Sequence, residues 1–217
     1  MEKSVKEQIE YLSGFALSRR VSMFRRRLAE RTRYLTVCLE NIYQSQNASA
    51  VLRTCDAFGI QDVHILENIN AYNINPDVSL GSEKWLTLQR YSVTPTVALE
   101  QLRAKGYRLI ATCPSEKGLS LDEFDVSAGK CALIFGSELT GLSDEALSCA
   151  DEFLYIPMRG FVESLNISVS AAIILHALSS NLRAHKVCWQ LSEDESEELM
   201  LQWLKLSVKS SKRLLDC

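Results

Sequence analysis

With 217 residues, 47% of them hydrophobic, and a formal net charge of −3, the chain is neither disordered nor fibrous and can bury one sizeable core. It contains no run of about 18 uncharged apolar residues, the length that spans a membrane, and its polar beginning does not resemble a secretory signal. Its seven cysteines are dispersed without a C-x-x-C pair, which favours buried thiols in a reducing compartment. We therefore expect a cytoplasmic protein with no membrane partner.

The charge is unevenly distributed along the chain. Residues 1–33 carry nine Lys and Arg against four Asp and Glu, about +5, whereas residues 34–182 carry nine against seventeen, about −8. The basic residues crowd the segment SRRVSMFRRRLAERTR (18–33), which we interpret as a helix. A basic helix beside an acidic body is typical of proteins that bind phosphates, and the alternative is a solvated helix that pairs with that body.

Strand and helix patterns alternate after the basic segment. Runs of apolar and β-branched residues predict strands at 34–42, 62–66, 107–113, 131–136 and 152–157. Helical spacing, capping residues and terminal glycines predict helices at 47–59, from Thr94 to Gly106, from Ser143 onwards, from Asn166 to Arg183, and after Ser192. This alternation indicates βαβ units. The predicted fold class is therefore α/β, with a mostly parallel sheet covered by helices on both faces.

The ligand site of such a sheet lies outside the carboxyl ends of the strands. We therefore expect the site in the loops that follow Thr112, Phe135 and Ile156. No G-x-G-x-x-G follows the first strand and no P-loop lysine motif occurs, which disfavours an NAD-dependent oxidoreductase or an NTPase. The three histidines are not spaced as metal ligands or as part of a triad, so we expect no metal.

Three stretches carry a specific resemblance. They are NIYQSQNASAVLRTCDAFGI (41–60), ALIFGSELTGLSDEAL (132–147) and YIPMRGFVESLNISVSAAIIL (155–175). In order and spacing, they resemble the three motifs of the SpoU/TrmH family of RNA ribose 2′-O-methyltransferases, of the SPOUT superfamily. The resemblance spans about residues 30–183. Together with GSEKW (81–85) and the flanking helices, it is closest to the tRNA guanosine-18 methyltransferases.

The resemblance implies methyl transfer from S-adenosylmethionine to a ribose 2′-hydroxyl of tRNA, at guanosine 18 of the D-loop. It also implies a homodimer and a deep C-terminal trefoil knot, which no strand pattern predicts. The implied domains are a basic helical extension (1–30), a knotted catalytic domain (31–185) and a C-terminal helical extension (186–217). Two alternatives stay open: the same chemistry on ribosomal RNA or another tRNA nucleotide, and a non-catalytic RNA-binding module of this fold.

The family motifs also imply site residues. The residues at the catalytic positions are Arg53, Asn47, Ser164, Asn166 and Glu138. The residues at the cofactor-binding positions are Thr112, Gly136, Ile156 and Leu165. The basic residues expected to contact RNA phosphates are Arg19, Arg20, Arg25, Arg26, Arg27, Lys84 and Arg90. Ser137 departs from the family pattern, because many relatives have asparagine before the glutamate of this motif.

For several of these residues, the sequence allows both a catalytic and a structural role. Arg53 is the family's residue at the reacting hydroxyl, where it acts either as a base or as a phosphate clamp, and arginine holds its proton to about pH 12. The alternative is a surface ion pair with Asp56, one helical turn away. Asn47 and Arg53 do not share a helical face, and if Asn47 caps the helix its side chain can reach elsewhere.

The cofactor positions also have structural explanations. A glycine at 136 lets the backbone approach a ligand closely. Ile156 and Leu165 otherwise read as packed core residues. We expect Ser164 or Asn166 to cap the helix that follows, and Leu165, which we expect to be buried, to offer its backbone to the adenosine.

Overall fold

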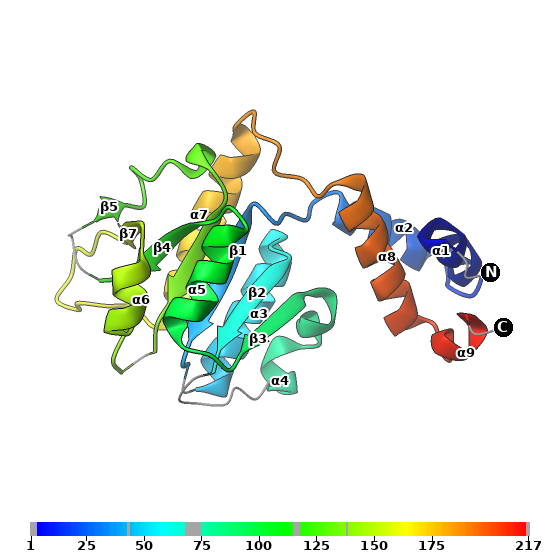
Figure 1. Ribbon diagram of the computed structural model, residues 1–217, viewed down its shortest axis with the longest axis horizontal. Helices are drawn as coiled ribbons and strands as arrows, with labels where there is room; N and C mark the ends of the chain where they lie inside the picture. The colour runs from blue at the N-terminus through cyan, green and yellow to red at the C-terminus, as the bar shows by residue number, and fades with distance from the viewer. Residues whose placement is uncertain (1–3, 43, 68–74, 115–117, 138, 216–217) are drawn as a thin grey trace. The chain divides into compact units, whose positions relative to one another are not determined.

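The computed structural model of the protein describes residues 4–42, 44–67, 75–114, 118–137 and 139–215. The chain divides into two compact units (Figure 1). The two end segments, Met1–Thr32 and Gln190–Cys217, together form one of them, which we call the helical unit. Residues Arg33–Trp189 form the other, which we call the α/β unit.

The α/β unit is built on a parallel sheet. Its strands are β1 (Leu35–Glu40), β2 (Asp62–Leu66), β3 (Thr87–Tyr91), β4 (Arg108–Thr112), β5 (Leu119–Ser120), β6 (Cys131–Phe135) and β7 (Glu152–Tyr155). They lie in the order β3-β2-β1-β6-β4-β7-β5, and each neighbouring pair is parallel. The predicted α/β class and the parallel sheet are confirmed.

Helices cover both faces of this sheet (Figure 1). The unit contains α3 (Ser45–Phe58), α4 (Pro76–Ser79), α5 (Pro95–Ala104), α6 (Asp144–Cys149) and α7 (Ile167–Ala184), with 3₁₀ turns η1 (Ser82–Trp85) and η2 (Val126–Ala128). Val37 and Leu39 of β1 pack in the core cluster with α3 and α7, while Cys38 between them packs in the cluster with α5 and α6. Strands buried on both faces explain the continuous apolar runs of the sequence.

The predicted helix ends are confirmed with one correction. Thr94 caps α5, Gly59 ends α3 in a left-handed conformation (φ 78°), and Asn166 caps α7 by accepting a hydrogen bond from the Ser168 N–H. The start of α3 was placed too late, because the helix begins at Ser45. Asn47 therefore lies within the first turn and does not precede the helix as its cap.

The helical unit contains α1 (Val5–Ser13), α2 (Ser18–Leu28), α8 (Glu193–Ser207) and α9 (Ser211–Leu215). The capping box predicted at Ser192 and Glu195 opens α8. The basic helix is shorter than predicted, because α2 ends at Leu28. Beyond it, Arg31 is buried with its guanidinium 5.4 Å from the ring of Trp203, which excludes it from the exposed basic face.

One helix among the described residues, α7, is long and apolar enough to cross a membrane, with a mean hydropathy of 1.2. Its apolar side is buried in the core against α3 and the sheet. The apolar character of α7 is therefore that of a core helix.

A buried histidine lies in the core between the sheet and α5. The Tyr91 hydroxyl donates to Gln89 (3.1 Å), so Nδ1 of His64, 2.9 Å from the Tyr91 oxygen, carries the proton in that hydrogen bond. Nε2 is buried and has no hydrogen-bond partner in the described part of the chain. Burial, and secondarily the charge of Lys105, lowers the pKa of His64 from 6.5 to about 4.

This histidine predicts a pH dependence of stability. Because its pKa is lower in the folded protein, the unfolded chain binds more protons between pH 6.5 and 4, and stability falls as the pH falls through that window. We expect His64 to contribute a loss of about 3 kcal/mol between pH 7 and pH 4. Chemical denaturation across this range should show a correspondingly smaller loss for His64→Gln. A matched change at the exposed His185 should leave the loss unchanged, and equal losses in wild type and His64→Gln would contradict the assignment.

Candidate functional site

Three of the four predicted cofactor positions, Thr112, Gly136 and Ile156, lie along one edge of the sheet. β4 lies between β6 and β7, and all three strands run parallel, so their carboxyl ends meet at that edge. Thr112 is the last residue of β4, and its hydroxyl donates to the carbonyl of Ile134 on β6 (2.8 Å). Gly136 and Ile156 directly follow β6 and β7. The structure thus brings three of the four positions to the place where a parallel sheet binds its ligand.

Backbone groups are available at these positions. The main-chain N–H and C=O groups of Gly136, Ile156 and Leu165 form no hydrogen bond with any residue that the structure describes. Each of the three residues is half-buried, so Leu165 is less buried than the sequence predicts. Because partly buried peptide groups require partners, these residues offer donors and acceptors to a ligand.

The loop after β6 is closed by its own backbone. Ser137 and Gly141 exchange two N–H to carbonyl hydrogen bonds of 3.0 Å. A side chain at position 136 would place its Cβ 2.2 Å from the backbone of Gly141. The requirement for glycine is therefore set by residues 141–142, whereas the sequence alone suggested close approach of a ligand. The predicted catalytic residue Glu138 falls in this loop but lies outside the described residues.

Two predicted catalytic asparagines are in contact, one from the first motif and one from the third. Nδ2 of Asn166 donates to Oδ1 of Asn47 (3.1 Å), and the Asn47 side chain is buried. At its other end, Oδ1 of Asn166 accepts from the N–H of Ser168 (2.9 Å) and from its hydroxyl. These donors fix which end of the amide faces Asn47. Asn166 therefore caps α7 and joins it to α3.

The other two catalytic candidates have exposed side chains. Arg53 lies on α3, and its side chain forms no ion pair or hydrogen bond with a described residue, so the ion pair with Asp56 is absent. Ser164 likewise makes no side-chain hydrogen bond within the described ranges. Both side chains are thus accessible to a substrate, whereas Asn47 and Asn166 are held by each other.

Glu40 is a site-associated residue that the sequence did not identify. It ends β1 and is 1% exposed, and its carboxylate accepts hydrogen bonds from the N–H (3.0 Å) and the hydroxyl of Ser143. The same hydroxyl accepts from the N–H of Ala146 and so caps α6. Glu40 therefore ties the end of β1 to residues next to the Gly136 loop. The only indication in the sequence was a glutamate directly before the first motif. A carboxylate at the end of a strand is ordinarily expected to face solvent, so its burial was not predicted.

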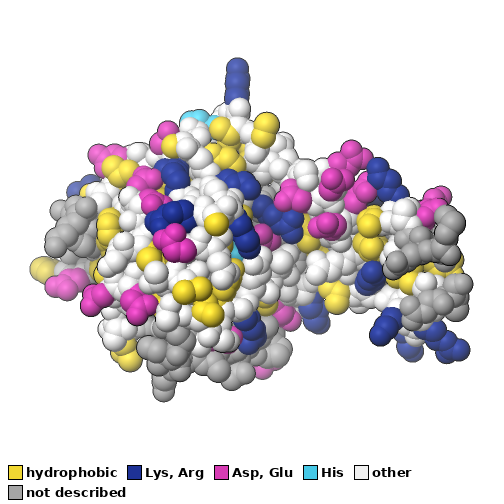
Figure 2. All heavy atoms as spheres, in the orientation of Figure 1, with side chains coloured by type: hydrophobic (Ala, Val, Ile, Leu, Met, Phe, Trp, Pro, Cys, Tyr) yellow, Lys and Arg dark blue, Asp and Glu magenta, His cyan; other side chains and the backbone are white. Residues whose placement is uncertain are grey.

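All of the predicted RNA-binding residues are exposed, and one of them, Arg90, forms an ion pair within the protein. Arg19, Arg20, Arg25, Arg26 and Arg27 all lie exposed on α2, and Lys84 is exposed on η1. Arg90 forms an ion pair with Glu67 (3.2 Å). Figure 2 shows Lys and Arg side chains gathered along the lower edge of the helical unit. The exposed basic face of α2 is an electropositive surface suited to a polyanion.

The sequence as a whole matches a known family. The model of the SpoU rRNA Methylase family matches residues 34–176, more than half of the chain. The chain belongs to this family. A tRNA (guanosine(18)-2′-O)-methyltransferase of Borreliella burgdorferi is 40% identical over 210 residues, which cover 97% of this chain and 95% of that protein. The helical unit is therefore included in the similarity.

Solved structures agree with this assignment. The A. aeolicus TrmH/SpoU tRNA modifying enzyme has a TM-score of 0.78 at 30% identity, over 88% of this chain and 97% of that one. The SpoU methyltransferase AviRb from Streptomyces viridochromogenes, in complex with AdoMet, has a TM-score of 0.60 at 24% identity, over 74% and 62% of the two chains. Because its identity is low, the second likeness shows the fold alone.

The double role of Asn166 can be tested with two substitutions. Asn166→Ala removes both the cap of α7 and the bond to Asn47, and we expect it to lower the free energy of unfolding by about 2 kcal/mol. Asn166→Asp keeps the acceptor for Ser168 but places an oxygen opposite Oδ1 of Asn47, so it loses the bond to Asn47 and retains the cap, and it should cost less than Asn166→Ala. Urea denaturation measures both. Equal losses in the two variants would mean that the cap contributes nothing.

The role of Glu40 can be tested by local hydrogen exchange. Glu40→Ala leaves the N–H of Ser143 without its acceptor, and we expect a loss of about 2 kcal/mol with faster amide exchange at residues 143–147. Glu40→Gln retains an oxygen acceptor and should lie between wild type and Glu40→Ala. If exchange at these amides stays at the wild-type rate in Glu40→Ala, the carboxylate does not hold this segment.

Proposed function

We propose that the protein methylates the ribose 2′-hydroxyl of guanosine 18 in tRNA, with S-adenosylmethionine as the methyl donor. The observation that carries the proposal is the near full-length similarity, at 40% identity, to an enzyme that is named for this reaction. The accessible Arg53 and the linked Asn47 and Asn166 support a catalytic reading over a non-catalytic RNA-binding module.

We propose that the adenosine of the donor binds at the sheet edge described above. The peptide groups of Gly136, Ile156 and Leu165, which are unpaired among the described residues, can bind polar atoms of the adenine and ribose, and Thr112 lies between the first two. When bound, S-adenosylmethionine supplies an electrophilic methyl carbon, and the ribose oxygen bonds to it as the carbon–sulfur bond breaks. The remaining tasks of the protein are to position the two reactants and to accept the hydroxyl proton.

The surroundings of each side chain support the proposed catalytic roles. Asn47 and Asn166 hold the first turns of α3 and α7 together, which keeps Leu165 at a fixed distance from the helix that carries Arg53. Arg53 is exposed and unpaired among described residues, so its guanidinium can bind the substrate. We propose that it acts at the 2′-hydroxyl, either as the proton acceptor or by clamping the adjacent phosphate. Ser164 and Glu138 remain predicted catalytic residues from the family motifs.

The domain arrangement suggests separate tasks for the two units. We propose that the α/β unit is the catalytic domain, as predicted for residues 31–185, and that the terminal segments bind tRNA. The exposed arginines of α2 support this division, because contacts to phosphates position an RNA without reading its sequence.

We further propose a homodimer with a deep trefoil knot in each protomer. The dimer is supported by exposed apolar side chains on α7 and in the loop before it, including Val169, Ile173 and Phe161. The knot is supported by the family motifs. A cytoplasmic location is consistent with the six described cysteines, all of which are free thiols.

The proposal predicts methyl incorporation into tRNA. Purified protein with labelled S-adenosylmethionine and a tRNA transcript should place one methyl group on the ribose of guanosine 18, located by mass spectrometry of nuclease fragments. A transcript with 2′-deoxyguanosine at this position should accept none. Labelling of ribosomal RNA, or of another tRNA nucleotide, in preference to this site would replace the proposed substrate while retaining the reaction.

The assignment of Arg53 has its own test. Arg53→Ala should lower kcat at least about 100-fold, because it removes the group that acts on the reacting hydroxyl or the neighbouring phosphate. The Kd for S-adenosylmethionine should stay near the wild-type value. Arg53→Lys keeps the positive charge and should retain more activity if the residue clamps a phosphate. Wild-type kcat in Arg53→Ala would remove Arg53 from the catalytic residues.

A further inference from the structure

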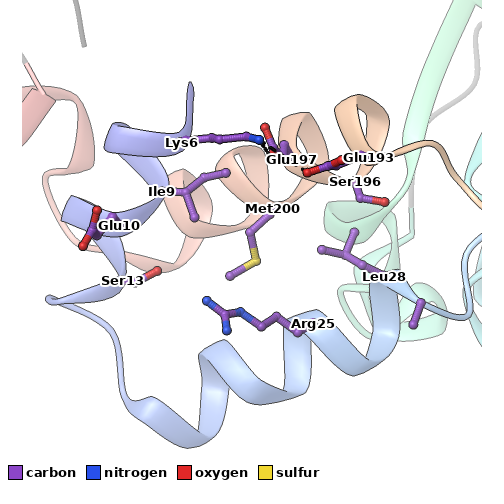
Figure 3. Close-up of a pocket in the computed structure, with 11 residues that line it drawn as sticks. Lys6, Ile9, Glu10, Ser13, Arg25, Leu28, Glu193, Ser196, Glu197 and Met200 are labelled. Atoms are coloured by element: carbon purple, nitrogen blue, oxygen red, sulfur yellow. Dashed lines mark hydrogen bonds and ion pairs between the residues drawn. The ribbon is translucent and has the colours of Figure 1, made fainter. Parts of the chain in front are cut away.

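The helical unit contains a cavity of about 660 Å³ between α1, α2 and α8 (Figure 3). This volume lies within the range of about 300–1,000 Å³ that is typical of small-ligand sites. Apolar side chains of Ile9, Leu28 and Met200 form part of its wall. None of the residues that match the family's three motifs belongs to this unit, so the cavity is separate from the proposed methyl-transfer site.

Two polar side chains line the cavity, the buried hydroxyl of Ser13 and the exposed guanidinium of Arg25. Ser13 Oγ is buried and has no hydrogen-bond partner within the described residues, and the Arg25 guanidinium forms no ion pair or hydrogen bond with any of them. In Figure 3 these two side chains point toward each other beside Met200. A buried hydroxyl without a partner destabilises the protein, and a ligand that supplies the missing hydrogen bond removes that penalty.

The charges on the wall argue against a free anion as the ligand. Lys6 is bound by Glu193 (3.4 Å) and Glu197 (3.1 Å), and Glu10 also lines the cavity. Three carboxylates and two cations therefore face it, so an isolated phosphate would meet net repulsion. A neutral planar ring with donors and acceptors on its edge, and apolar faces, matches the apolar wall and the two unpaired polar groups.

We propose that this cavity receives one unpaired nucleobase of the substrate RNA. Arg25 and Ser13 bind the polar edge of the base, and Met200 and Ile9 contact its face. Unpaired bases in loops are the parts of an RNA that proteins bind in this way. The arginines next to Arg25 on α2 are exposed and positioned for the attached phosphates. The inference rests on the proposed tRNA substrate and adds a second recognition site to it.

The test compares binding of two RNAs to the full-length protein. The first is the tRNA transcript, and the second is a blunt RNA duplex that has no unpaired base. Ser13→Leu removes the hydroxyl and places apolar bulk at that point of the wall without changing any charge, so we expect about 10-fold weaker binding of the tRNA and unchanged binding of the duplex. Thermal denaturation reports whether the variant is folded, and the Kd for S-adenosylmethionine reports separately whether the α/β unit is intact.

A matched pair of arginine substitutions separates the base from the phosphates. Arg25→Ala and the control Arg26→Ala each remove one charge from the same helix, so both should weaken duplex binding equally. Only Arg25→Ala should lose a further roughly 10-fold in binding of the tRNA. Equal effects of the two changes on the tRNA, or wild-type tRNA binding by a folded Ser13→Leu, would overturn the proposal.

Failure of this inference is distinguishable from failure of the proposed function. If the wild-type protein methylates tRNA and the cavity variants bind it normally, only the nucleobase site is wrong. If the wild-type protein neither binds nor methylates tRNA, both proposals are overturned.

Discussion

The parallel pairing of β6, β4 and β7 is the constraint on which the site depends. Because three consecutive neighbours in the sheet run the same way, the chain leaves each at one edge. There, on either side of Thr112, the peptide groups of Gly136 and Ile156 have no hydrogen-bond partner among the described residues. Parallel strands need crossover connections, and the helices α3, α5, α6 and α7 of this unit cover both faces of the sheet. The same constraint that forms the core also creates the edge at which we propose that the ligand binds.

Small polar contacts convert this edge into a defined site. Asn166 joins the start of α7 to the start of α3, and Glu40 joins the end of β1 to the start of α6. Both contacts link segments more than 100 residues apart in the sequence. Both are at least partly shielded from water, where an unmet hydrogen bond is costly, so each stabilises one arrangement of the loops over its alternatives. The packed sheet stabilises the fold, and these hydrogen bonds fix the positions of the loops at its edge.

The sequence predicted the regular parts of this structure well, since strands buried on both faces and capped helices leave strong local patterns. β5 has two residues and leaves no pattern, and the first two residues of α3, Ser45 and Gln46, carry no apolar signal. The contact between Asn47 and Asn166 could not be predicted from spacing, because it joins two helices through the fold. The burial of Arg31 could not be predicted either. The sequence places it in the basic segment, but composition does not reveal that Trp203, far along the chain, packs against its guanidinium.

The distribution of charge suggests that attraction of the RNA and methyl transfer depend on different parts of the chain. The segment that forms most of the α/β unit carries a net charge of about −8, so RNA is repelled by much of the unit that we propose to be catalytic. Attraction must then come from the exposed arginines of α2, whose field reaches only about 8 Å at physiological salt. Attraction of that range favours any phosphate backbone and cannot select one nucleotide. Selection therefore depends on contacts to unpaired nucleotides at fixed, partly apolar sites, because a duplex presents none of these to the protein.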